Sequence, residues 1–293
     1  MKAGTTSLAA ALAAHPDVFA CPIKEPNHFC RELHEAKIAF KAPNLKHFDL
    51  RQYLQQSPLP ERHFAYVENR ADYKALFKAY SGQKWMLDAS TTYLTSPYAA
   101  AEIARAQPKA KILVVTRDPA VRAWSEFIMN VYIGVSDRDY CAALEREAAA
   151  LRIGQVPLFE RYVSASLYDP QIERFKWCFG EQNVLVAEFT DLVHNPDAVL
   201  DRIYQFLEIR SPEQKELPKL NGRQSPRSTI INSFLYKTGL KNLGGQILPK
   251  GIANIIRGIM YDARSEKMPD KFKDTFYQYY AEADLRAKPS TSS

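Results

Sequence analysis

Apolar and polar positions alternate along the chain in blocks that predict strands and helices in turn. Two runs, 111–116 (KILVVT) and 184–187 (VLVA), are almost continuously apolar, which is typical of parallel strands buried on both faces. Two shorter runs, 17–21 and 85–88, predict further strands. A buried parallel sheet is therefore expected at the centre of the fold.

Helical patterns fill the intervals between these strands. Capping residues before proline mark three helix starts, at Ser96-Pro97, Asp118-Pro119 and Asn195-Pro196. We expect helices over 6–14, 97–107, 119–132, 137–152, 169–178, 196–208 and 269–283. Strands that alternate with helices predict an α/β fold, a three-layer sandwich around a central parallel sheet. We expect one domain over 1–287 and a disordered tail over 288–293.

Composition places the chain among soluble globular proteins. Of 293 residues, 46% are hydrophobic and 25% charged, and no apolar run approaches the ~20 residues of a membrane helix. The sequence shows no signal peptide. The four cysteines form no CxxC pair, which predicts free thiols, a reducing cytoplasmic location and no structural zinc site.

The net charge of +6 is unevenly distributed. Between 217 and 261 there is no Asp or Glu, but there are several basic residues, namely Lys219, Arg223, Arg227, Lys237, Lys241, Lys250 and Arg257. Such a stretch suits an anionic ligand, an anionic polymer or a membrane surface, and it equally suits a solvated basic loop. Within it, the apolar segment 250–261 either packs into the core or makes peripheral contact with an anionic membrane.

A candidate phosphate loop opens the chain, with the sequence KAGTTSL running directly into a helix. Gly4 permits a tight turn, and the amides that follow point outward from a helix N-terminus, where an anion binds. The hydroxyl groups of Thr5, Thr6 and Ser7 add donors, and Lys2 adds a charge. The order differs from a Walker loop, whose Lys follows its glycines. An ordinary capped helix is the alternative.

A second candidate motif follows the KILVVT strand. Arg117 stands at the strand's carboxyl end, where ligands of parallel α/β sheets bind, and its planar guanidinium suits a phosphate. Ser125 lies about two turns into the next helix. Alternatively, Arg117 pairs with a carboxylate and Ser125 is a packed helix residue.

Together these motifs resemble the sulfotransferase family that uses 3′-phosphoadenosine 5′-phosphosulfate (PAPS), in its heparan-sulfate-type and bacterial branch. KAGTTSL resembles the 5′-phosphosulfate loop, and TRDPAVRAWSEF resembles the 3′-phosphate segment. Further similar segments follow in the family's order: HPDVFACPIKEPNHF, DASTTYLTSP, the stretch from SLYDP to YQFLEI, and NGRQSP. The resemblance covers residues 2–226 and implies a P-loop-like sulfotransferase fold.

The resemblance also implies roles for particular residues. Lys2 would stabilise the leaving phosphate, and Glu25 would be the acceptor's base. The implied nucleotide contacts are Lys2, Ala3, Gly4, Thr5, Thr6, Ser7, Arg117, Ser125, Gly222 and Arg223. A salt bridge of Glu25 with Lys24 or another neighbour is the alternative to its role as the base.

Three features depart from the family's pattern. Asn27 is an extra residue between Glu25 and the His28-Phe29 pair. Ala89 stands where the branch often has a lysine, so another cation or Lys2 alone must neutralise the sulfate. Relatives also place a buried strand before the loop, which this sequence lacks. Asp88 and His28 are possible second bases or orienting groups.

The expected function is in-line transfer of a sulfuryl group from PAPS to a hydroxyl or amine of a glycan, lipid or small molecule, with no metal. A nucleotide-dependent kinase, or a non-catalytic module that binds anionic glycan or nucleic acid, are the alternatives. Only three aromatic residues interleave with the basic stretch, so a nucleic-acid partner is not expected. The sequence leaves the acceptor and the oligomeric state open.

Overall fold

The computed structural model describes residues 3–36, 48–132, 135–218, 225–226, 261–262 and 267–287. The chain divides into two compact units. Unit 1 contains the described residues 3–36, 49–117 and 168–218, and unit 2 contains residues 48, 118–132, 135–167, 225–226, 261–262 and 267–287. All four cysteines are free thiols, as predicted. Among the described helices, none combines the length and apolar character needed to cross a membrane.

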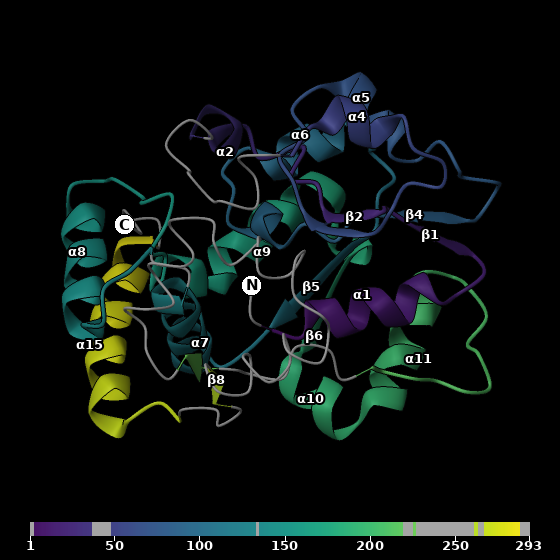
Figure 1. Cartoon of the computed structure of the whole chain (residues 1–293). Coiled ribbons are helices and arrows are strands. Elements are labelled where there is room, and N and C mark those ends of the chain that lie inside the picture. Colours follow the sequence, from purple (N-terminus) through teal and green to yellow (C-terminus); the bar gives the residue numbers. More distant parts are fainter. Residues whose placement is uncertain are drawn as a thin grey trace. The chain divides into compact units, whose positions relative to one another are not determined.

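Unit 1 is an α/β assembly of short parallel strand pairs with helices around them (Figure 1). Its strands are β1 (Val18–Ala20), β2 (Ile23–Glu25), β3 (Arg62–Phe64), β4 (Trp85–Leu87), β5 (Ile112–Thr116) and β6 (Val184–Glu188). Its α-helices are α1 (Thr5–Ala13), α2 (Arg31–Ala36), α4 (Leu50–Leu54), α5 (Arg70–Ala75), α6 (Ala99–Ala106), α9 (Tyr168–Phe179), α10 (Phe189–His194) and α11 (Pro196–Phe206). Two 3₁₀ turns, η1 (Thr91–Leu94) and η3 (Glu181–Asn183), complete it.

The three described strand pairs of unit 1 are all parallel. β1 pairs with β4, β2 with β3, and β5 with β6, with Val114 opposite Val186. The buried strands predicted from the two apolar runs are thus confirmed as β5 and β6, and the predicted runs at 17–21 and 85–88 as β1 and β4. The sequence pattern does not predict the strands β2 and β3 or the helices α2, α4, α5 and α10, because each is too short for a periodic pattern to identify.

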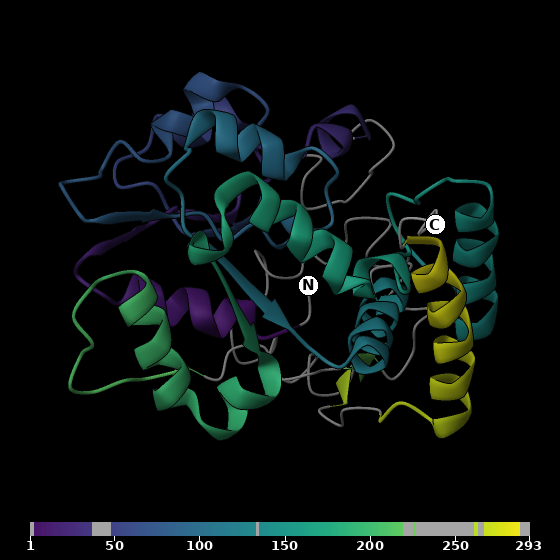
Figure 2. The ribbon, with the colours of Figure 1, turned by 180° about the vertical axis from the view of Figure 1, so that it is seen from behind.

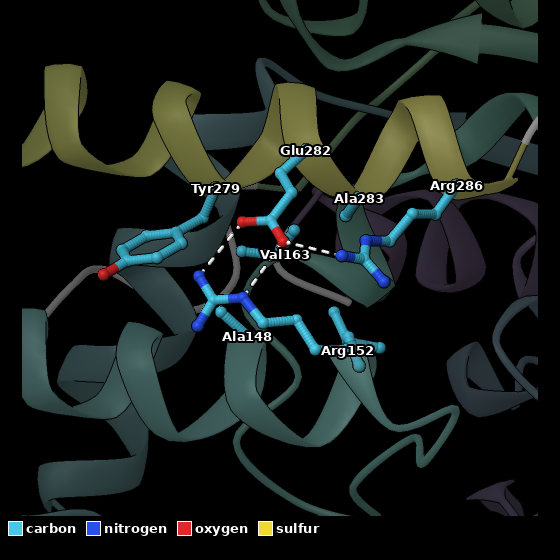
Figure 3. A pocket seen from close by; sticks show the side chains of 8 residues that line it. Ala148, Arg152, Val163, Tyr279, Glu282, Ala283 and Arg286 are labelled. Carbon is cyan, nitrogen blue, oxygen red and sulfur yellow. Dashed lines mark hydrogen bonds and ion pairs between the residues drawn. The ribbon is translucent and has the colours of Figure 1, made fainter.

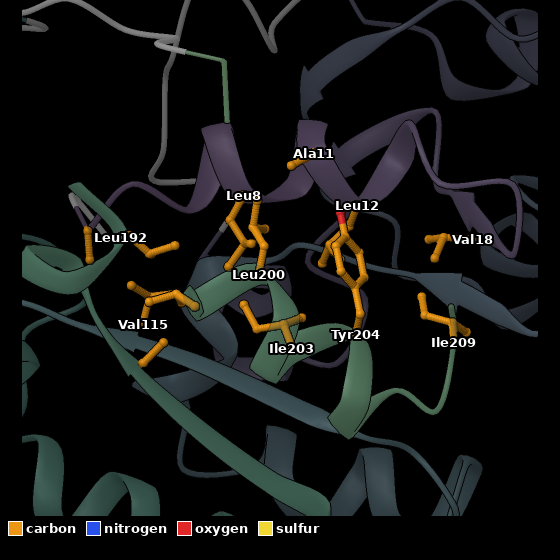
Figure 4. Close-up of a cluster of buried hydrophobic side chains, with 13 residues drawn as sticks. Leu8, Ala11, Leu12, Val18, Val115, Leu192, Leu200, Ile203, Tyr204 and Ile209 are labelled. Carbon is orange, nitrogen blue, oxygen red and sulfur yellow. The ribbon is translucent and has the colours of Figure 1, made fainter. Parts of the chain in front are cut away.

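Both faces of the β5–β6 pair are covered. Because strand residues alternate between faces, Val115 and Ala187 pack with α1, α10 and α11, whereas Val114 and Val184 pack with α6 and α9. Figure 4 shows the first cluster, in which Leu8 and Leu12 of α1 meet Leu200 of α11. Seen from behind, the strands lie between these two helix layers (Figure 2). Within unit 1 the three-layer prediction is therefore confirmed.

Unit 2 is mainly helical. It contains α7 (Pro119–Tyr132), α8 (Tyr140–Arg152), the 3₁₀ turn η2 (Ser164–Ser166), the antiparallel pair β7 (Ser225–Pro226) and β8 (Tyr261–Asp262), and α15 (Asp270–Ala287). An aromatic core joins the three α-helices, with Trp124 of α7, Tyr140 of α8 and Phe272 of α15 in mutual ring contact. The predicted helices over 119–132, 137–152 and 269–283 are confirmed, with ends shifted by a few residues.

Candidate functional site

The candidate phosphate loop stands where strands β5 and β6 end. Gly4 is the residue before α1 and has φ of +75°, a left-handed conformation that glycine adopts without strain. A Cβ atom at this position would lie 2.8 Å from the ring of Phe189, the first residue after β6. Both the backbone conformation and the close ring therefore require glycine here.

The start of α1 provides donors for an anion. Gly4, the residue at the cap position, has no side chain that could cap this helix end, and Thr5, Thr6 and Ser7 are partly exposed. The first amides of a helix have no partner within the helix and carry the positive end of its dipole. The loop is therefore suited to hold a phosphate, while Ala3 is buried behind it in the core of unit 1.

Arg117 reaches the same place from β5. Its guanidinium carbon lies 4.8 Å from the centre of the Phe189 ring, which also lies against Gly4. Stacking on the ring orients the planar guanidinium. The carboxyl ends of β5 and β6 thus bring a helix N-terminus and an arginine to one aromatic side chain.

Glu25, the candidate base, is buried at the end of β2 with both carboxylate oxygens occupied. Lys24 Nζ lies 2.6 Å from Oε1, and the hydroxyl of Thr91 donates to Oε2 at 3.1 Å. The exposed His63 ring nitrogen Nε2 lies 3.7 Å from Oε1. The salt bridge with Lys24 that the sequence offered as an alternative is therefore present, and each carboxylate oxygen has a second lone pair that can accept from a reacting hydroxyl.

Asp88, directly after β4, accepts four hydrogen bonds through its carboxylate. Its Oδ2 accepts from the hydroxyls of Tyr93 and Tyr73 at 2.7 and 3.0 Å, and its Oδ1 accepts from the hydroxyl and the amide of Ser90 at 2.7 and 2.9 Å. Burial raises the pKa of Asp88, and the four donated hydrogen bonds act in the opposite direction. Since all four donors are intramolecular, the geometry favours a role in orienting this region.

His28 is held in one orientation. Its ring stacks on Tyr73 with centroids 4.2 Å apart, and its Nδ1 lies 2.7 Å from the carbonyl oxygen of Val67. A carbonyl only accepts, so Nδ1 carries the proton and Nε2 of the neutral ring carries the lone pair. Burial lowers the pKa of His28, which favours this neutral form near pH 7.

The family follows from comparison of the sequence with known proteins. The model of the sulfotransferase family matches residues 1–213. The chain belongs to the sulfotransferase family. A search of curated protein sequences finds no match.

Two solved structures resemble this sulfotransferase. The crystal structure of a sulfotransferase from Alicyclobacillus acidocaldarius shares 22% identity with a TM-score of 0.60, and the match covers 98% of this chain and 90% of that one. It supports the fold. A crystal structure of mouse sulfotransferase SULT7A1 complexed with PAP shares 14% identity with a TM-score of 0.33, over 96% of this chain and 89% of that one, a likeness too weak to carry further inference.

Several residues and segments with predicted roles lie outside the described residues of this sulfotransferase. They are Lys2, Gly222, Arg223, most of the segment 250–261 and the tail 288–293. Ser125 is described and is buried within α7 of unit 2. Their roles remain predictions, and so does the single domain over 1–287. Within the described parts of the sulfotransferase, no cluster of three or more His, Cys, Asp or Glu is placed to hold a metal ion.

A pocket of unit 2 lies between α8 and α15, away from any predicted site residue in sequence (Figure 3). Arg152 donates to both carboxylate oxygens of Glu282 at 3.0 Å, and Arg286 donates to Glu282 at 3.2 Å. Both guanidinium groups pair with the single carboxylate of Glu282, as is typical of a helix–helix contact on a protein surface.

Asn27 has a structural role that the sequence does not reveal. It is fully buried with φ of +52°, a conformation that Asn tolerates better than most residues. Its Nδ2 donates to the carbonyls of Glu25 and Ala65 at 2.8 and 3.0 Å, and its Oδ1 accepts from the hydroxyl of Thr92. The extra residue in the motif thus forms a hydrogen-bonded bend in the backbone, which positions Glu25 on one side and His28 on the other. The only signal in the sequence is the extra residue itself, between Glu25 and the His28-Phe29 pair.

We expect Asn27→Gly to lower the free energy of unfolding by about 2–3 kcal/mol, because three buried partners lose their hydrogen bonds. Asn27→Ala should cost about 1 kcal/mol more, since alanine is strained at this φ. Urea unfolding of both variants measures these losses. Wild-type stability in both variants would mean that water replaces the side-chain bonds.

Proposed function

We propose that this protein transfers a sulfuryl group from PAPS to a hydroxyl or amine of a glycan, a lipid or a small molecule. The observation that carries the proposal is the meeting of the α1 N-terminus, Gly4 and Arg117 at the ring of Phe189. A donor with phosphates fits these residues, because a helix N-terminus presents backbone amides and the positive end of its dipole to an anion, and the guanidinium adds a positive charge. The family supports this function over the kinase and the binding module.

Each part of the donor has candidate partners in the chain. The amides of Thr5, Thr6 and Ser7 would hold the 5′-phosphate, with Ala3 and Gly4 shaping the loop. Arg117 would bind the 3′-phosphate, assisted by Ser125, Gly222 and Arg223, while Lys2 would meet the charge of the leaving phosphate. When bound, the nucleotide supplies the sulfuryl group.

Glu25 is the proposed general base of the reaction. Its carboxylate is enclosed and oriented by Lys24 and Thr91, so little reorganisation is required when it takes the proton of the acceptor. His28 and Asp88 are proposed to orient the acceptor side, with His28 Nε2 as a second possible proton acceptor. Positioning and electrostatics would then do most of the catalytic work, as in phosphoryl transfer.

The test is a transfer assay with sulfur-labelled PAPS against panels of glycans, lipids and phenols. Label in an acceptor, with release of adenosine 3′,5′-bisphosphate (PAP), is the expected result. Transfer from labelled ATP instead would favour a kinase. Salt-sensitive binding of anionic glycan without turnover would favour the binding module. Co-sedimentation with anionic vesicles at low and high salt tests whether the segment 250–261 makes peripheral contact with a membrane. We also propose a cytoplasmic location for the protein.

We expect Arg117→Ala to weaken binding of PAPS and PAP together by about 2–3 kcal/mol, the value of a charge-assisted hydrogen-bonding pair. Binding of adenosine 5′-phosphosulfate, which has no 3′-phosphate, should hardly change. Calorimetric titration of the three nucleotides measures this, with Arg105→Ala, an exposed arginine of α6, as the control. Equal losses for all three nucleotides would refute the 3′-phosphate assignment.

A further inference from the structure

Lys24 and Glu25 form one of the most enclosed ion pairs in the described structure. Their side chains are 15% and 9% exposed, and among ion pairs between described residues only Arg122–Glu126 is more enclosed. Surface pairs such as Lys176–Glu173 leave the carboxylate 65% exposed. A lysine held this way loses much of its hydration, so its position has an energetic cost that the pairing must offset.

The alternation of side chains along β2 would by itself place Lys24 and Glu25 on opposite faces of the strand. Ile23 and Glu25 are the two buried residues of β2 and share its buried face, while Lys24 between them belongs to the opposite face. The Lys24 side chain nevertheless curls back to bring Nζ to 2.6 Å from Glu25 Oε1. An ammonium has three donors, and Glu25 is the one hydrogen-bond partner of Nζ among the described residues. Two donors are therefore available to a second anion.

Lys24 lies at the edge of unit 1 where the candidate phosphate loop begins. The ladder of β1 and β4 continues past Ala20, since Cys21 N–H donates to Leu87 O at 2.9 Å and Ala89 N–H donates to Lys24 O at 3.2 Å. α1 and β1 are joined by a tight reversal and run in opposite directions (Figure 1). The carboxyl end of β1, and Lys24 beyond it, thus lie at the edge where α1 begins. Ligands of parallel α/β folds bind at this edge.

We propose that Lys24 is a switchable counter-ion that neutralises Glu25 before the reaction and turns to the oxygens of the sulfuryl group once Glu25 takes the proton. This inference rests on the proposed function. When Glu25 accepts the proton of the acceptor, its negative charge is lost and the ammonium at 2.6 Å has no counter-charge. The negative charge available at this edge is then that of the transferring group and the leaving phosphate. Lys24 remains protonated throughout, so no proton beyond that of the acceptor moves.

Glu25→Gln imitates the protonated base and so tests the switch without any acceptor. Calorimetric titration with PAPS and with PAP compares four proteins: the wild type, Glu25→Gln, Lys24→Met and the double variant. Because Glu25→Gln releases Lys24 to the sulfuryl group, we expect PAPS to bind about tenfold more tightly than to the wild type, as for one hydrogen bond to a charged group. The affinity for PAP, which has no sulfuryl group, should stay unchanged.

The double variant decides the assignment. Lys24→Met in the Glu25→Gln background should abolish the tenfold gain, and Lys24→Arg in that background, which keeps the charge, should retain most of it. Lys176→Met, which breaks an exposed ion pair, is the matched control and should change neither affinity. Thermal melting of each variant confirms that it is folded, and Lys24→Arg keeps the test valid if Lys24→Met unfolds.

Two results would overturn the inference: equal PAPS affinity in the wild type and Glu25→Gln, or a gain that persists without Lys24. Lys24 would then be a static partner of Glu25. If the wild type binds neither PAPS nor PAP, the proposed function itself fails, which is a distinguishable outcome.

Discussion

Replacing Glu25 by Gln is expected to lower the rate of sulfuryl transfer by about 10²–10⁴, the range for loss of a general base. The amide keeps the size of the carboxylate and can still accept from Thr91, but it cannot take up a proton. The affinity for PAP should be unchanged, because the loss lies in the chemical step. The rate is measured with labelled PAPS and the acceptor that the panel identifies.

Asp88→Asn and His28→Gln are the comparisons that locate the base. Asp88 accepts from four donors, so an amide nitrogen in its place would face a hydroxyl or amide donor. We therefore expect Asp88→Asn to reduce stability and activity together. If Glu25→Gln stays active while a folded Asp88→Asn is inactive, the base is Asp88. If only His28→Gln is inactive, the base is His28 Nε2.

The sequence predicts the central layer of the fold well, because β5 and β6 need apolar residues on both faces. Val114 and Val115 pack into opposite helix layers, so the strand buries apolar side chains on both faces. The loop before α1 is also predictable, since Gly4 precedes a run of hydroxyl residues. What pattern reasoning could not provide is the reason for Gly4: the ring of Phe189, which is 185 positions away in the sequence, meets the loop only after folding.

Buried polar residues account for most of what the sequence does not reveal. In the sequence Asn27 is only an extra residue in a motif, whereas in the structure it forms the bend between Glu25 and His28. For Lys24 the sequence indicates no more than a salt bridge. In unit 2, Arg122 and Glu147 read as ordinary charged positions of helices, yet each is 1% exposed. From the polarity pattern alone, charged residues are predicted at the surface. Charged side chains are stable in the interior only where tertiary hydrogen bonds satisfy them.

Arg122 and Glu147 both form hydrogen bonds with the segment 161–166. Arg122 donates from Nη2 to the carbonyls of Arg161 and Tyr162 at 2.9 and 2.7 Å and from Nε to the hydroxyl of Ser166 at 2.7 Å. Glu147 accepts from the amides of Tyr162 and Val163 at 2.7 Å and from the amide and hydroxyl of Ser164 at 2.8 and 2.6 Å. Burial raises the pKa of Glu147, and these hydrogen bonds stabilise its charged form.

Glu147→Ala is expected to lower the free energy of unfolding by about 3–5 kcal/mol, since it leaves four donors without their acceptor in the interior. Glu147→Gln should also destabilise, because its NH₂ group replaces an oxygen that accepts backbone amides. Denaturant unfolding measures both. Glu145→Gln is the matched control: it lies two residues earlier on α8, and its carboxylate, 52% exposed, pairs with Arg152 at the surface.

The control should lose far less stability than either Glu147 variant, because water can replace the partners of an exposed carboxylate but cannot reach those of Glu147. Similar small losses at both positions would mean that segment 161–166 relaxes to let water in, and that the buried charges do not hold it. A large loss restricted to Glu147 supports the opposite conclusion: α7 and α8 are fixed through this segment by charges that a sequence pattern would have placed in solvent.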